Sequence, residues 1–230
     1  MQKTYCKVAI LSIRKSPNET SEMISQMLYG ETCEIIEQKG DYAKIITDFD
    51  EVSGWVLLYA LGVENRQGSR QVLHHKFAYL NGETLLSLGS EVYTNVEKIQ
   101  NVDNATIIKI AKNFLNTPFL YGGRSIFGVD ASALVQLVYK VLGVSLPRFA
   151  FQQAEYGTTL DFVEESEGGE IAFFDDENGE ICHAGIMLSD YKILHCYGKV
   201  RVDALDSIGI FNEELNKHTH KLRFIKRIVE

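Results

Sequence analysis

Polar and apolar positions alternate in short runs through the first 63 residues of the chain. Four runs rich in β-branched and aromatic residues predict strands, and turn signals separate them. The predicted strands cover residues 7–13, 32–38, 42–47 and 54–58, and the turns lie at Ser16-Pro17-Asn18, at Gly30, at Lys39-Gly40-Asp41 and at 48–51. The pattern predicts a small all-β, barrel-like domain over residues 1–63.

Residues 64–100 carry a weaker pattern. Residues 65–70 have the composition of a polar linker, whereas residues 72–80 and 84–93 predict two or three strands with a turn at Asn81-Gly82. Two interpretations stay open for this segment. It is either a β-rich connector or a reduced second copy of the preceding β module.

The pattern changes near residue 101. Apolar residues at helical spacing predict a short amphipathic helix over residues 106–115 and a second helix from Ala131 to about residue 142. Asp130 is a good N-cap for the second helix, and Gly143 is a good stop signal. Strand-like runs follow at residues 170–174, 181–188, 192–196, 200–202 and 221–227. Helices followed by an antiparallel sheet predict an α+β domain over residues 101–230.

Position 131 lies where an active site is expected. A side chain in the first turn of a helix is close to unpaired backbone N–H groups and to the positive end of the helix dipole. That environment lowers the pKa of a thiol and stabilises an oxyanion. Ala131 offers only a methyl group, so the residue at this position cannot act as a nucleophile.

Two downstream histidines are candidates for a base and its orienting partner. In an antiparallel hairpin, His183 and His195 share a face only if the loop has an odd number of residues, since the sum of their numbers is even. A three-residue loop at 189–191 meets this condition and makes the two histidines diagonal neighbours. The opposite face is then apolar, and it carries Cys182 and Cys196, which we expect to be buried structural thiols.

The other four histidines are not expected to form a site. His74 and His75 are predicted to point to opposite faces of a strand, and His218 and His220 lie near a polar end. The four cysteines show no Cys-x-x-Cys pair. The sequence therefore predicts no metal site and no cofactor.

Charge and cysteine usage limit the classes of partner. A net charge of −8 argues against nucleic acid and against an anionic membrane as partners. The scattered cysteines do not form a disulfide framework, which favours a reducing compartment. Residues 1–16 contain no apolar stretch of signal-peptide length, so we expect a cytoplasmic protein, or a periplasmic one if a leader has been removed. No pattern in the sequence indicates an oligomeric state.

Several motifs resemble known domains. The run from Leu11 to Pro17, with Gly30-Glu31 and Gly54-Trp55-Val56, resembles a bacterial SH3 domain. Residues 117–157 and 168–201 resemble the NlpC/P60 cysteine peptidases. Their pattern is Pro-Tyr-x-Trp-Gly-Gly, Asp-Cys-Ser-Gly, Leu-Pro-Arg, Gly-Asp-Leu-x-Phe-Phe, His-Val-Gly-Ile and a second histidine. The matching residues here are Pro-Phe-Leu-Tyr-Gly-Gly at 118–123, Asp-Ala-Ser-Ala at 130–133, Leu-Pro-Arg at 146–148, Gly-Glu-Ile-Ala-Phe-Phe at 169–174, His-Ala-Gly-Ile at 183–186, and His195.

The resemblance implies both a fold and a reaction. The fold is an SH3-like barrel followed by a papain-like domain in which helices pack on an antiparallel sheet. The combination resembles the γ-D-glutamyl-L-diamino acid endopeptidases, also called dipeptidyl-peptidase VI, which cleave murein peptides after γ-D-Glu. It implies that a free L-Ala-γ-D-Glu-diamino acid peptide is the ligand, with either meso-diaminopimelate or L-Lys as the diamino acid.

The resemblance also assigns roles to individual residues. Position 131 would hold the nucleophile, His183 would be its base, and His195 would orient that base. Asp130 and Ser132 would help to bind the amine end of the substrate. Further substrate contacts are expected from Phe119, Tyr121 and Arg148.

This chain departs from the family pattern at several of these positions. Ala131 replaces the cysteine, Phe119 replaces a tyrosine, Tyr121 replaces a tryptophan and Ala133 replaces a glycine. Ser132 cannot take over as nucleophile because one step along a helix turns its side chain by about 100°. Two explanations of Ala131 stay open. It is either an engineered change in a working peptidase or a natural loss in a pseudoenzyme that binds murein fragments or a partner protein.

Overall fold

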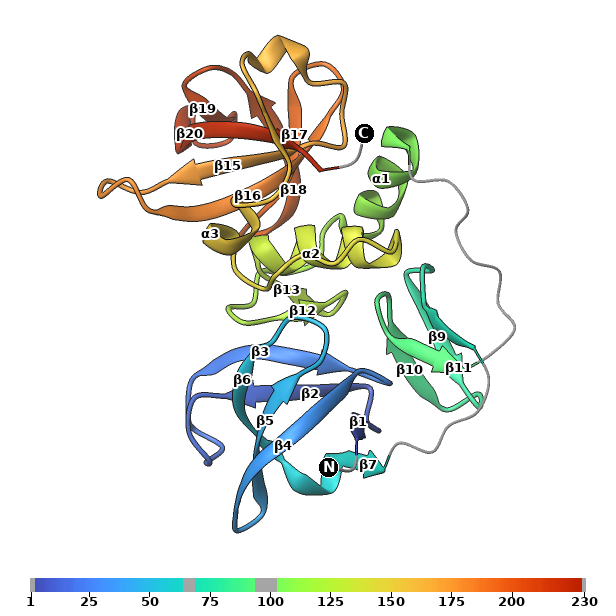
Figure 1. Ribbon diagram of the computed structural model, residues 1–230. Coiled ribbons are helices and arrows are strands. Elements are labelled where there is room, and N and C mark those ends of the chain that lie inside the picture. The colour runs from blue at the N-terminus through green and yellow to red at the C-terminus, as the bar shows by residue number, and fades with distance from the viewer. Residues whose placement is uncertain (1–2, 64–68, 94–102, 229–230) are drawn as a thin grey trace. The chain divides into compact units, whose positions relative to one another are not determined.

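A computed structural model describes residues 3–63, 69–93 and 103–228 of the 230-residue chain. The chain divides into two compact units (Figure 1). The first comprises Met1–Ile99 with Leu120–Val129, and the second comprises Gln100–Phe119 with Asp130–Glu230. Residues 65–68 of the expected polar linker and the expected boundary near residue 101 lie outside the described residues.

The first unit is built on a seven-stranded antiparallel sheet. Its order is β3-β2-β6-β5-β4-β1-β7. The strands are β1 (Thr4–Cys6), β2 (Ile10–Arg14), β3 (Met23–Leu28), β4 (Thr32–Lys39), β5 (Tyr42–Thr47), β6 (Ser53–Leu57) and β7 (Leu61–Val63), with a 3-10 turn at Leu58–Ala60. Alternate residues of β2 and β5, such as Ile13 and Ile45, are fully buried in its core, as the period-2 pattern predicts. The predicted strands at 32–38, 42–47 and 54–58 match β4, β5 and β6, whereas β3 was not predicted.

Two short pairs of strands also belong to the first unit. β8 (Arg70–Val72) pairs with β11 (Glu91–Tyr93), and β9 (Phe77–Leu80) pairs with β10 (Thr84–Ser87). The predicted turn at Asn81-Gly82 joins β9 and β10, and both of its residues have positive φ. The single strand predicted over residues 72–80 is interrupted, because His74 and His75 lie between the end of β8 and the start of β9. Their rings are neighbours, with centroids 4.2 Å apart, and do not point to opposite faces.

A buried ion pair fastens residues 120–129 inside the first unit. These residues form the hairpin of β12 (Arg124–Ser125) and β13 (Gly128–Val129). Arg124 Nη1 lies 2.8 and 2.9 Å from the two carboxylate oxygens of Glu31, and both side chains are at least 96% buried. The backbone N–H of Arg124 donates to Gln26 Oε1 in β3 over 2.7 Å. The chain is thereby held firmly a few residues before Asp130.

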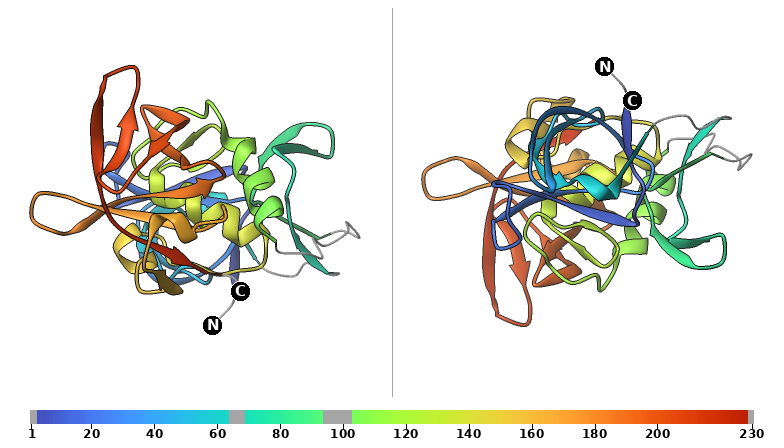
Figure 2. Two further views of the ribbon diagram at one scale, coloured as in Figure 1. Left: turned by 90° about the horizontal axis from the view of Figure 1, so that it is seen from above. Right: turned by 90° about the horizontal axis from the view of Figure 1, so that it is seen from below.

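The second unit contains a sheet of order β14-β20-β15-β16-β17-β18-β19. Its strands are β14 (Thr158–Leu160), β15 (Ile171–Asp175), β16 (Ile181–Leu188), β17 (Lys192–Tyr197), β18 (Lys199–Leu205), β19 (Gly209–Asn212) and β20 (Lys217–Arg227), with a 3-10 turn at Val163–Glu165. Pairing of β19 with β20 closes six of these strands into a barrel. The hairpin of β15 and β16 projects from the rest of this sheet (Figures 1 and 2).

Three helices accompany this sheet in the described residues. They are α1 (Asn104–Ala111), which continues into a 3-10 turn at Lys112–Phe114, α2 (Ala131–Val141) and α3 (Ala150–Gln153). Helix α2 contacts β16 and β17, α3 contacts β16, and α1 contacts α2. The predicted helix ends are confirmed: the Asp130 side chain accepts the N–H of Ala133, and Gly143 follows α2 with φ of +82°.

Candidate functional site

The beginning of α2 is held by a polar cluster. The Asp130 carboxylate accepts a 2.9 Å hydrogen bond from the backbone N–H of Ala133, and this caps the helix. Arg148, whose side chain is 99% buried, donates to Oδ1 of Asp130 and to Oγ of Ser132, each over 3.0 Å, and its second terminal nitrogen pairs with Oδ2 of Asp130. The structure thus brings three of the predicted binding residues together.

Ala131 is the first residue of α2 and is 8% exposed. Its methyl group can neither donate nor accept a proton. The position keeps the backbone environment that favours a thiolate or an oxyanion, but this chain has no reactive group there.

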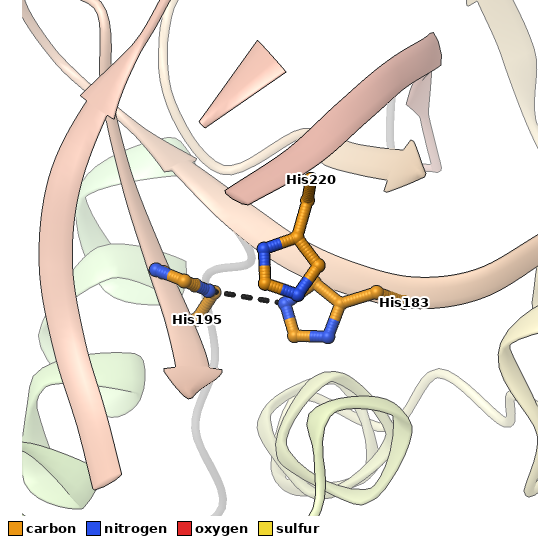
Figure 3. Close-up of side chains that lie close together, drawn as sticks. All are labelled: His183, His195 and His220. Atoms are coloured by element: carbon orange, nitrogen blue, oxygen red, sulfur yellow. Dashed lines mark hydrogen bonds between the residues drawn. The ribbon is translucent and has the colours of Figure 1, made fainter. Parts of the chain in front are cut away.

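The two predicted histidines lie on one face of the β16–β17 hairpin. Leu188 pairs with Lys192, so the loop is the predicted three residues, and Gly185 lies opposite His195. His183 Nε2 is 3.0 Å from His195 Nδ1 (Figure 3), as expected for diagonal neighbours. Gly185 makes room for this contact, because a Cβ there would lie 2.9 Å from Cβ of His195.

Asp203 in β18 extends the pair and was not predicted. Its Oδ2 is 3.0 Å from His195 Nε2, and its Oδ1 accepts from Arg201 over 2.9 Å. Burial raises the pKa of Asp203, but the hydrogen bonds from His195 and Arg201 outweigh it, so the pKa lies below its usual value. The β17–β18 turn at Gly198 could have suggested a partner on β18, but the sequence alone does not give its register.

An ionised Asp203 fixes the proton positions in this chain of hydrogen bonds. A carboxylate only accepts, so His195 Nε2 must donate to it. When His195 is neutral, its Nδ1 accepts, and His183 Nε2 must therefore donate. The remaining nitrogen of His183, Nδ1, then carries a lone pair. Helix α2 contacts strand β16, which carries His183, and Ala131 at the first position of this helix offers no nucleophile.

His220 in β20 lies against the histidine pair, and this proximity was not predicted. Its ring stacks on His183 with centroids 4.0 Å apart, and its Nδ1 is 2.9 Å from Thr219 Oγ1. Strand β20 begins at Lys217, earlier than expected, because it pairs with β19 to close the barrel. Counting back by two from Leu222, which contacts the core, would have placed His220 on the inner face.

Burial makes His183 and His220 weakly basic. Desolvation, together with His220 and His195 nearby, holds the pKa of His183 well below its usual value. Desolvation and His195 lower the pKa of His220 to about 4, although Asp203 acts in the opposite direction. Both rings are therefore neutral near pH 7, where neutral imidazole can act as a base or as a ligand.

The two aromatic residues of the predicted site, Phe119 and Tyr121, are exposed. Phe119 belongs to the second unit and is 46% exposed, whereas Tyr121 belongs to the first unit and is 63% exposed. Cys196 is buried as predicted, and burial raises its pKa to about 12. The prediction for Cys182 is wrong, because it lies in the projecting end of the β15–β16 hairpin and is exposed.

Comparisons with known proteins match both units. The NlpC/P60 family model matches residues 116–219, and the model of the bacterial dipeptidyl-peptidase SH3 domain matches residues 13–61. A solved structure of an NlpC/P60 family protein from Bacillus cereus ATCC 10987 has a TM-score of 0.85 at 16% identity, and the match covers 99% of this chain and 100% of that one. The shared fold therefore extends over almost the whole chain.

Two curated relatives match a shorter segment. The gamma-D-glutamyl-L-lysine dipeptidyl-peptidases of Bacillus subtilis (strain 168) and Bacillus cereus (strain ATCC 10987 / NRS 248) are 36% and 31% identical to this chain over 91 residues. These residues are 39% of this chain, and 30% and 27% of the two relatives. The chain thus spans less than a third of the length of the relatives it matches.

No helix among the described residues is long and apolar enough to cross a membrane.

Proposed function

The chain carries an NlpC/P60 domain behind a bacterial dipeptidyl-peptidase SH3 domain, and from this premise we propose that it binds short cell-wall peptides without cleaving them. Its homologues are peptidoglycan hydrolases and dipeptidyl-peptidases. The ligand is a free L-Ala-γ-D-Glu-diamino acid peptide, bound in a papain-like arrangement of α2 against the sheet. A cytoplasmic location stays a prediction.

The observation that carries this proposal is the network of hydrogen-bonded polar side chains next to Ala131, which itself cannot react. Asp130, Arg148 and Ser132 are joined by hydrogen bonds of 3.0–3.2 Å at the beginning of α2. The Asp130 carboxylate is 16% exposed, so one part of it can receive a ligand amine while the rest stays paired. Removal of a triad nucleophile costs a factor of about 10⁶ in kcat, so binding remains as the activity of the Ala131 form.

The binding arm of the test uses calorimetry with two peptides, L-Ala-γ-D-Glu-meso-diaminopimelate and L-Ala-γ-D-Glu-L-Lys. An N-acetylated version of each peptide lacks the amine charge and should bind about tenfold more weakly or worse. Asp130→Asn keeps a capping side chain but removes the negative charge, and it should weaken binding of the free peptide to a similar degree. Asp206→Asn, which changes a carboxylate at an exposed turn, is the control. Equal affinity for free and acetylated peptides would contradict the assigned role of Asp130.

The cleavage arm restores the nucleophile with Ala131→Cys. Cleavage by this variant alone would identify Ala131 as the single lesion in a peptidase site. If the variant binds the peptide without cleaving it, other substitutions such as Phe119 have also removed the reaction, and the chain is a binding protein. If neither form binds either peptide, the proposed ligand is wrong.

A further inference from the structure

The strongest feature that the proposed function does not use is the convergence of three histidines. His183, His195 and His220 come from three different strands, and one ring nitrogen of each lies within 4.8 Å of the others. Figure 3 shows these nitrogens turned toward a common space between the rings. Peptide binding at α2 requires no third histidine, and His220 belongs to neither the Asp130 cluster nor the His183–His195–Asp203 chain.

We propose that His183, His195 and His220 form a binding site for a divalent transition-metal ion of the Zn²⁺ class. Three imidazoles without a carboxylate or thiolate suit Zn²⁺, Co²⁺, Ni²⁺ and Cu²⁺ better than Mg²⁺ or Ca²⁺. Three histidine ligands also leave the fourth tetrahedral position of zinc open for water or for a ligand oxygen. This inference does not rest on the proposed peptide function.

The distances lie within reach of zinc geometry. With Zn–N bonds of about 2.0–2.1 Å, tetrahedral ligands place nitrogens about 3.3–3.4 Å apart. His183 Nε2 and His195 Nδ1 are already 3.0 Å apart. The widest pair must approach by about 1.4 Å at most, from the 4.8 Å limit. His220 supplies this movement, because it is half-buried and must turn out of its stack on His183.

The groups behind two of the three rings match what metal-bound histidines require. His195 Nε2 is held by the Asp203 carboxylate, and His220 Nδ1 is held by Thr219 Oγ1. Oxygen partners on the far nitrogens orient the rings and leave the near nitrogens with their lone pairs. The ion replaces the proton shared by His183 Nε2 and His195 Nδ1, and that proton moves to His183 Nδ1. The exchange therefore requires no net release of a proton.

An entry route is present on the side of His220. This residue and Thr219 line a cavity of about 590 Å³ beside the loop end of the β15–β16 hairpin. Lys221 and Arg223 at the rim pair with Asp175. Two further carboxylates, Asp176 and Glu177, line the same cavity and attract a cation toward the histidines.

The test measures zinc binding to the full chain with Ala131 in place, so that no thiol is present at that position. The protein is first stripped with a chelator and then titrated with Zn²⁺ in competition with a chromogenic chelator. The expected result is one equivalent of Zn²⁺ per chain. Co²⁺ should give the intense visible absorption bands of a tetrahedral complex.

His220→Phe keeps a ring in the stack and removes the ligand, so it should weaken zinc binding by a factor of about 100 or more. His218→Phe is the matched control, because this histidine lies two residues away on the same strand and pairs with Asp206. His75→Ala controls for the neighbouring rings of His74 and His75. Circular dichroism of each variant confirms that it is folded.

Asp203→Asn provides a second variant that keeps all three ligands. It should weaken zinc binding about 10- to 100-fold, because Asp203 orients His195. The proposal is overturned if the protein binds no Zn²⁺ up to about millimolar concentration, or if His220→Phe binds it as tightly as the His218→Phe control. Failure of peptide binding in the earlier test would leave this result unaffected, since no peptide is present.

Discussion

Replacing Glu31 by glutamine should destabilise the first unit strongly. The change keeps the size of the side chain and its ability to accept the N–H of Leu28, which now donates to Glu31 Oε2 over 2.7 Å. It removes the negative charge beside Arg124, whose side chain is 99% buried. Burial lowers the pKa of Arg124, but Glu31, Asp50 and Glu91 more than compensate, so its pKa is raised in the native protein. Arginine is not deprotonated in proteins, so Arg124 stays charged after the change.

Breaking a buried ion pair on one side costs about 3–5 kcal/mol. Asp50 and Glu91 still contribute negative charge near Arg124, which places the expected loss near the lower limit, about 3 kcal/mol. With a urea m-value of about 1–3 kcal/mol per molar, the unfolding midpoint should fall by about 1–3 M.

Trp55 provides the assay. It is the single tryptophan of the chain, it lies in β6, and it is 9% exposed, so its fluorescence reports unfolding of the first unit. Glu34→Gln, an exposed change in β4, should change the free energy of unfolding by less than about 0.5 kcal/mol. Adding Arg124→Met to Glu31→Gln should recover most of the loss, because the unpaired charge is then gone. A Glu31→Gln midpoint equal to that of Glu34→Gln would refute the reasoning.

Two further predictions concern stability. Gly30→Ala should cost about 1–3 kcal/mol more stability than Gly40→Ala. Both glycines have positive φ, but a Cβ at Gly30 would collide with the carbonyl oxygen of Glu91, whereas a Cβ at Gly40 meets open space. Equal losses of unfolding free energy in urea titrations of the two variants would show that the backbone near Glu91 moves to accept the methyl group. Glu170→Gln should cost about 1–3 kcal/mol at pH 7. Burial raises the pKa of Glu170, but hydrogen bonds from Arg227 and neighbouring N–H groups outweigh it, so the folded pKa is depressed. The carboxylate therefore stabilises the native state above the unfolded pKa near 4.5, and the difference from the glutamine variant should vanish as the pH falls through the folded pKa. A difference that persists at pH 2 would contradict this assignment.

Local patterns predicted the elements whose partners are close in sequence. The β16–β17 hairpin needs only the alternation of apolar residues and the parity of one loop, and both are visible between residues 181 and 196. Helix α2 likewise follows from the Asp130 cap, the apolar spacing and Gly143. Each of these elements is specified within about 16 residues of its own sequence.

Elements that depend on distant partners were missed. Strand β3 is buried on both faces over its last four residues, so the period-2 pattern that marks a half-buried strand is absent. Arg124 is a lone charge in a glycine-rich loop, and its burial depends on Glu31, 93 residues earlier. His220 lies in a polar run that the barrel closure turns inward. Sequence reasoning placed His183 and His195 side by side on one hairpin face, but it could not place Asp203 or His220.

Asp203 offers the sharpest test of the candidate base. In an Ala131→Cys background, proton transfer from the thiol to His183 Nδ1 creates a positive charge that His195 and the ionised Asp203 stabilise through two hydrogen bonds. Asp203→Asn removes the negative charge, so the thiolate should become less favourable and the apparent pKa of the introduced thiol should rise. A hydrogen bond to a charged group is worth about 1.5–3 kcal/mol, which corresponds to about one to two pH units.

The pH dependence of alkylation by iodoacetamide measures this pKa without any peptide substrate, because the thiolate is the reacting form. Asp206→Asn in the same background is the matched control, since Asp206 also pairs with a histidine, His218, but at an exposed turn. If both variants alkylate with the same midpoint, Asp203 has no influence on position 131. The chain of hydrogen bonds would then be a structural feature of the barrel, and His183 would lose its assignment as an oriented base.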